Sequence, residues 1–191
     1  MQLLVHRTDG KTGRYAQADS GRAQMLARRL DPRTLFASGP IVIGVLNPFS
    51  VLNPDEVCWV EVRTDLPLAV QLPAGVDSVR RLADRAEYEA ILARQWPRWR
   101  AQGPAGGGAL VEALVELSFR GGGVLHLHVT GTRQDTALAE LVFGAPAITA
   151  TFAPDGTVFI NPKCLVRARV YHSLQEVAYP AGLWFAEADD I

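Results

Sequence analysis

The sequence has few cysteines, few lysines and no long apolar run. Cys58 and Cys164 are its only cysteines, too few for a disulfide framework and too far apart for a zinc knuckle. No apolar stretch reaches the roughly 18 residues that cross a bilayer, so we expect no contact with a membrane. The segment 1–7 lacks the basic start and apolar stretch of a signal peptide. These absences lead us to expect a soluble, cytoplasmic protein.

The chain also lacks an excess of either charge. Its 191 residues include 19 basic and 20 acidic side chains, for a formal net charge of −1, so no overall field attracts a polyanion. The hydrophobic share of 48% is typical of a globular chain. We expect a single domain over residues 1–191, with a flexible glycine-rich loop at 103–108.

Strand-like alternation of apolar and polar residues dominates what is present. It is clearest at 57–63, 110–119, 124–130 and 164–171, and glycine-rich turns at 121–123 and 153–156 indicate hairpins. Apolar residues at 41–46 and 66–72 predict two further strands.

Helical spacing predicts one long helix and one or two short ones. The long helix is expected to begin near Asp77 or Ser78 and to be broken by Pro97, and short ones are expected from Ser20 to Leu30 and from Asp135 to Val142. The predicted fold is therefore α+β, with a twisted, mainly antiparallel sheet of about seven to nine strands.

His126 and His128 form the best candidate site for chemistry. Residues two apart on a strand project from the same face, so both imidazoles can reach one ion. A turn at 121–123 would place Glu116 opposite His128, and a divalent metal held by His126, His128 and Glu116 is one interpretation. A plain polar sheet face and acid–base work by one histidine are the alternatives.

Aromatic and arginine residues beside turns indicate a binding surface for a protein partner. Asn47-Pro48 and Asn53-Pro54 flank Phe49 and would hold it on a rigid loop, or the same loop tucks its apolar residues under the sheet. Trp96, Trp99 and Arg100 are of the types that most often anchor interfaces, although a core position is the alternative for each tryptophan.

The segment 80–100 supports a further interpretation. It combines Arg80, Arg81 and Arg85 with Trp96 and Trp99, which suits single-stranded nucleic acid. The arginines can equally pair with acidic neighbours on the same helix.

No complete catalytic motif accompanies these features. The chain contains no Gly-x-Ser-x-Gly, no His-Glu-x-x-His and no Cys-x-x-Cys. We therefore expect a non-catalytic interaction protein, such as a subunit of a larger cytoplasmic assembly. The alternatives are a small metal-dependent enzyme or ligand-binding domain centred on His126 and His128, and a nucleic-acid contact through 80–100.

Overall fold

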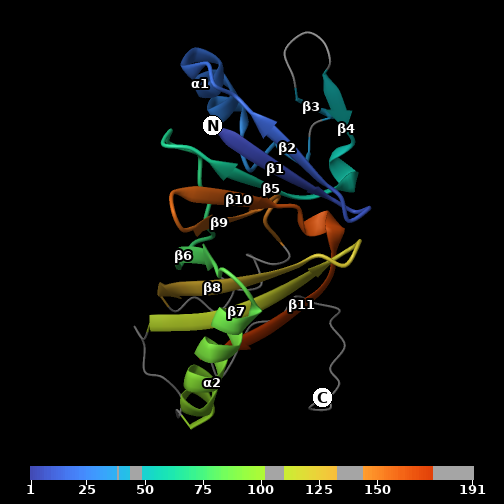
Figure 1. The fold of residues 1–191 in the computed structure, drawn as a ribbon. Coiled ribbons are helices and arrows are strands. Elements are labelled where there is room, and N and C mark those ends of the chain that lie inside the picture. Colours follow the sequence, from blue (N-terminus) through green and yellow to red (C-terminus); the bar gives the residue numbers. More distant parts are fainter. Residues whose placement is uncertain (38, 44–48, 102–109, 133–143, 174–191) are drawn as a thin grey trace.

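A large mixed sheet runs through the whole molecule (Figure 1). The computed structural model describes residues 1–37, 39–43, 49–101, 110–132 and 144–173. It confirms an α+β fold with nine strands in the main sheet, all pairs antiparallel except one. The predicted loop at 103–108 and the predicted helix at 135–142 lie outside the described residues. Within the described part, no helix is long and apolar enough to cross a membrane.

The strand order of the large sheet is β11-β7-β8-β6-β9-β10-β5-β1-β2, and β6 and β9 are the parallel pair. A separate two-stranded sheet pairs β3 with β4. The strands are β1 (Gln2–Arg7), β2 (Thr12–Ala16), β3 (Ile41–Ile43), β4 (Ser50–Leu52), β5 (Val57–Arg63), β6 (Val76–Arg81), β7 (Leu110–Phe119), β8 (Val124–Thr132), β9 (Ile148–Phe152), β10 (Gly156–Ile160) and β11 (Leu165–His172).

The described residues form two α-helices, which lie at opposite ends of the molecule (Figure 1). Helix α1 (Ser20–Arg29) begins after Asp19, whose carboxylate accepts a hydrogen bond from the Arg22 N–H. Helix α2 (Arg85–Ala101) begins after Asp84, which accepts from the Glu87 N–H, while the Glu87 carboxylate accepts from the Ala83 N–H.

The predicted long helix is wrong at its start. Residues 76–81 form strand β6, and a register shift between Val76 and Ser78 leaves the buried residues Val76 and Val79 three apart, a spacing that imitates a helix. The predicted strand at 66–72 is absent from the structure.

The expected break at Pro97 is also wrong. Helix α2 continues through Pro97, which is exposed. A proline has no N–H to donate to the carbonyl four residues earlier, here that of Ala93. Ala93 is also exposed, so water can bond to this carbonyl.

The described residues contain an internal repeat that relates 2–63 to 110–172. In each repeat a hairpin (β1–β2 or β7–β8) is followed by a second hairpin (β3–β4 or β9–β10). A 3₁₀ turn and a last strand then follow, and this strand pairs with the first one (β5 with β1, β11 with β7). We call these segments the first and second repeat.

The repeats agree at the level of single hydrogen bonds. Asn53 and Asn161 each accept a bond from the N–H two residues ahead, at Asp55 and Lys163. Both pairs of first and last strands shift register two residues after the end of the 3₁₀ turn, at Cys58 and at Val166. The repeats differ in their sheets, because β9–β10 joins the large sheet whereas β3–β4 forms its own.

The repeats meet at their Asn-Pro turns. Asn161 is fully buried, and its side-chain amide donates to the carbonyl oxygens of Pro54 at 3.0 Å and Val57 at 2.9 Å. The hairpin turns also touch, since a Cβ on Gly121 would lie only 2.2 Å from the carbonyl oxygen of Thr8. The large sheet is continuous across this junction because β10 pairs with β5.

The two asparagines form a matched pair for a stability test. Asn161→Ala should lower the free energy of unfolding by roughly 2–4 kcal/mol, because it removes two hydrogen bonds from a fully buried amide to carbonyls of the other repeat. Asn53→Ala removes an exposed turn contact and should cost about 1 kcal/mol or less. Urea unfolding at neutral pH measures both, and equal losses would contradict a special role for Asn161.

The turn glycines form a second matched pair. Gly121 and Gly122 have φ values of 82° and 83°, but a Cβ on Gly122 would meet nothing within 4 Å. Gly122→Ala should therefore cost about 1 kcal/mol, the strain of the left-handed backbone. Gly121→Ala must also move the Thr8 backbone and should cost roughly 3 kcal/mol or more. Thermal melts of both variants test this difference, which disappears if the turns do not touch.

Candidate functional site

The two histidines lie on one face of β8, as the alternation predicts, but opposite partners other than those expected. Glu116 faces His126, and Leu114 faces His128. The turn comprises Arg120, Gly121 and Gly122, one residue earlier than predicted, and the Phe119 N–H donates to the Gly123 carbonyl.

Contacts of Arg120 explain this register. Its backbone N–H donates to the Cys164 carbonyl, and its guanidinium donates to the Lys163 carbonyl at 3.0 Å. Both bonds hold Arg120 inside the turn, which moves every pair of the hairpin by two residues. A shift of two preserves the faces, so the predicted apolar face of this hairpin is correct.

Each histidine of β8 has its own carboxylate. His128 Nε2 lies 2.7 Å from Glu112 Oε1, and His126 Nε2 lies 3.5 Å from Glu116 Oε2. The other carboxylate oxygen of Glu116 lies 3.0 Å from the Arg167 guanidinium. Among the described residues, no three His, Cys, Asp or Glu side chains are arranged to hold a metal ion. The divalent metal at His126, His128 and Glu116 thus stays a prediction.

Helix α2 lies against this polar face. Tyr88 is buried and packs on the His126 ring with centroids 4.5 Å apart, and its hydroxyl has no hydrogen-bond partner among the described residues. Burial, followed by the nearby charge of Glu116, raises the pKa of Tyr88 far above its ordinary value. The hydroxyl is therefore a neutral, buried group.

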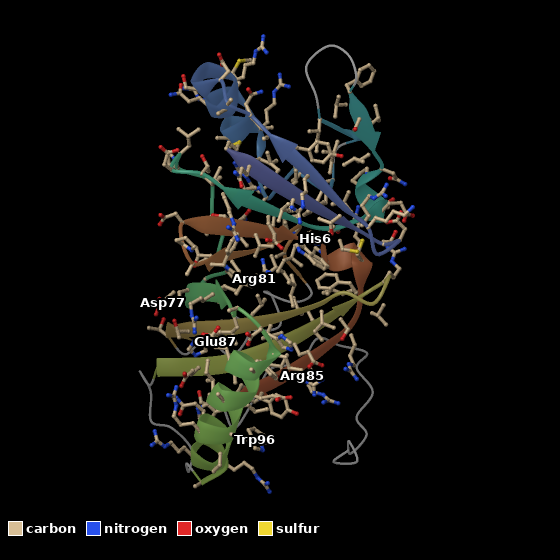
Figure 2. The ribbon with its side chains drawn as sticks, viewed as in Figure 1. His6, Asp77, Arg81, Arg85, Glu87 and Trp96 are labelled. Carbon is tan, nitrogen blue, oxygen red and sulfur yellow. The ribbon has the colours of Figure 1, made fainter. Side chains whose placement is uncertain are left out.

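The aromatic anchors expected on α2 have different surroundings. Trp99 is buried with Ile91 and Leu114, which agrees with the core alternative. Trp96 is half-buried and meets the edge of the Tyr171 ring at 5.1 Å, while Arg100 is exposed. Figure 2 shows Arg85, Glu87 and Trp96 placed along α2, away from the junction of the repeats.

A second polar cluster, not foreseen from the sequence, lies where the repeats meet. Glu61 is 5% exposed, and its Oε1 lies 3.0 Å from His6 Nε2 and 2.9 Å from an Arg81 guanidinium nitrogen. Trp59 donates its indole N–H to the same oxygen and stacks on the His6 ring at 4.3 Å. Figure 2 labels His6 and Arg81 in this central region.

The electrostatics of Glu61 follow from these contacts. Burial by itself would raise the pKa of Glu61, but the hydrogen bond from His6 and the positive charge of Arg81 lower it to about 2. The carboxylate is thus ionised, and three donors converge on one oxygen. The cluster joins β1, β5 and β6, and its groups are occupied with one another. The only sequence signal for it was a charged residue inside the alternating segment 57–63.

The two cysteines are free and buried, as expected for packed thiols. Burial and the adjacent Cys164 raise the pKa of Cys58 to about 12. A protonated, buried thiol is a poor nucleophile, so the geometry favours a packing role.

Comparison with known proteins adds no further assignment. The chain matches no protein-family model, no curated protein and no solved structure.

Glu61 predicts a specific pH dependence of stability. A carboxyl whose pKa is lower in the folded state contributes stability above its ordinary pKa of 4.5, and this contribution is lost as the pH falls toward about 2. Glu61→Gln should therefore cost roughly 2–4 kcal/mol at pH 7. The difference from the wild type should shrink below about pH 4.5.

Glu89 supplies the control for that measurement. It forms an exposed pair with Arg85 at 2.7 Å, so Glu89→Gln should change stability by less than about 0.5 kcal/mol. Urea unfolding at pH 7, 5 and 3.5 follows all three proteins. A Glu61→Gln penalty that is constant over this range would show that its charge is not what stabilises the cluster.

Proposed function

We propose that this protein is a non-catalytic interaction protein that binds a protein partner, as a subunit of a larger cytoplasmic assembly. The observation that carries the proposal is an exposed apolar surface on the first repeat. Val42 and Val51 face each other across the small sheet and are 57% and 55% exposed, and Phe49, next to β4, is 59% exposed. We call these three residues the hairpin patch. Apolar side chains grouped on a surface in this way are typical of binding sites.

The groups that could perform chemistry give less support to an enzyme. The histidines of β8 have carboxylate partners beneath α2, and His6 is engaged with Glu61 and Trp59. A general base needs a free position beside its substrate, and the His128 Nε2 atom is already hydrogen-bonded to Glu112 at 2.7 Å.

The nucleic-acid alternative has similarly little support. Arg80 pairs with Glu87 at 2.8 Å, Arg85 pairs with Glu89, and Arg81 binds the buried Glu61. With Trp99 buried as well, few groups of the segment 80–100 are available to stack on bases.

Phe49 provides the direct test of this proposal. Phe49→Ala should change the free energy of unfolding by no more than about 0.5 kcal/mol, because its side chain is largely exposed. The same change should weaken the complex with a stoichiometric partner by more than about 1 kcal/mol, as expected for an aromatic anchor. Thermal melts and quantitative co-purification of the tagged chain measure the two effects.

Val166 is the matched control, since it is 68% exposed on β11, in the other repeat. Val166→Ala should leave both stability and the complex unchanged. A loss of roughly 3–5 kcal/mol in Phe49→Ala would instead identify a core residue. The proposal also fails if the wild-type chain retains no stoichiometric partner, or if Phe49→Ala binds that partner as well as the wild type.

A further inference from the structure

The second repeat pairs with a strand that has no counterpart beside the first repeat. Strand β6 lies between β8 and β9, antiparallel to β8 with Val79 opposite Val129, and parallel to β9 through Arg80 and Thr151. It belongs to the segment that links the repeats, and it joins the two hairpins of the second repeat into one sheet.

The corresponding position of the first repeat is an open groove. Strands β2 and β3, the counterparts of β8 and β9, are not paired with each other and belong to separate sheets. Between them lies a cavity of about 660 Å³, bounded by β2, α1 and β3. Its apolar wall includes Leu26 from the helix and Ile43 from β3, together with Met25 and Val42, which are 60% and 57% exposed.

The backbone of β2 is prepared for one more strand. The Gln17 N–H donates to the Met1 carbonyl, and the Lys11 carbonyl accepts from the Arg7 N–H. The even-numbered residues Arg14 and Ala16 between them therefore direct their N–H and C=O groups away from β1. In the second repeat, His126 of β8 is the counterpart of Arg14, and it also directs its main-chain groups away from the first strand of its hairpin. Its carbonyl accepts from the Leu82 N–H at 2.8 Å. The corresponding groups of β2 form no main-chain bond with another strand among the described residues.

The charges around the groove indicate what kind of strand fits. Arg14, Arg22 and Arg29 line it, and none of them forms an ion pair with a residue of the described part of the chain. Three arginines beside an apolar wall complement a segment that alternates apolar and acidic side chains, since successive residues of a strand point to opposite sides.

We propose that the groove between β2 and β3 binds an extended, alternately apolar and acidic segment of a partner protein by strand addition, in the place that β6 occupies in the second repeat. The inference rests on the proposed interaction function and specifies its partner chemistry and binding mode. Main-chain hydrogen bonds to Arg14 and Ala16 would pair the partner segment with β2. The apolar wall of the groove and its arginines would select the apolar and acidic side chains of that segment.

A defined peptide tests this mode of binding with the intact chain. The probe is a fluorescent decapeptide of five Val-Glu repeats, and its binding is followed by polarisation. We expect saturable binding at least tenfold tighter than that of the Val-Lys and Gly-Glu decapeptides, which lack the acidic and the apolar component respectively. Absence of saturable binding, or equal binding of all three, overturns the proposal.

Variants separate strand pairing from simple charge attraction. Ala16→Pro removes an outward N–H without affecting the bonds to β1, and proline is tolerated on an edge strand. Because the lost N–H would pair with the probe, this variant should bind the probe at least tenfold more weakly. Arg22→Glu with Arg29→Glu should do the same. Arg28→Glu is the control, because Arg28 is exposed on α1 but does not line the groove, and it should bind within twofold of the wild type.

The outcomes also separate this proposal from the broader one. If Ala16→Pro fails to fold, the comparison of the Arg22/Arg29 variant with the Arg28 control decides whether the probe binds in the groove. Equal binding of the probe by the Arg22/Arg29 variant and the Arg28 control overturns strand addition. If the co-purified partner is lost in Phe49→Ala but retained by the groove variants, the interaction function stands and the groove proposal fails.

Discussion

The buried side chain of Asn161 is the contact on which the continuity of the fold depends. The Asn161 backbone N–H donates to the Cys58 carbonyl, and the side-chain amide donates to the carbonyls of Pro54, in the 3₁₀ turn of the other repeat, and of Val57, at the start of β5. These bonds sit where β10 ends beside β5, so they fix the register of the one strand pair that joins the repeats directly. A buried amide with every bond made is stabilising, whereas a partly satisfied one is costly, and this makes the junction specific.

Polar groups deeper in the sheet follow the same requirement. The carboxylate of Glu61 is ionised because His6, Arg81 and Trp59 surround it, and the histidines of β8 face carboxylates under α2. Buried charge is tolerated in this molecule where partners from different strands converge. The buried carboxylate is thus paired with basic side chains of other strands, while Val42, Phe49 and Val51 form an exposed apolar surface on the first repeat.

Strand β6 shows how far local pattern can mislead. Val76, Val79 and Leu82 have helical spacing, and the surrounding arginines support the same interpretation. The structure places Val76 and Val79 in a strand because β8 and β9 both offer unpaired edges, and pairing between strands outweighs a local preference. The helix begins only after Asp84, where two capping bonds form: the Asp84 carboxylate accepts from the Glu87 N–H, and the Glu87 carboxylate accepts from the Ala83 N–H. The internal repeat was also missed, although Leu52-Asn53-Pro54 and Ile160-Asn161-Pro162 carry its signature.

The sequence by itself determined the α+β class, the hairpin of β7 and β8 with its apolar face, and the shared face of His126 and His128, because two-residue periodicity is a local property. Only the tertiary structure decided which carboxylate meets which histidine, since the bonds of Arg120 to Lys163 and Cys164, distant in the sequence, move the turn by one residue. It likewise decided that Trp99 is buried and that β2 lies at the edge of the sheet formed by the described strands. Burial and edge pairing depend on neighbours distant in the chain, and composition and spacing carry no record of them.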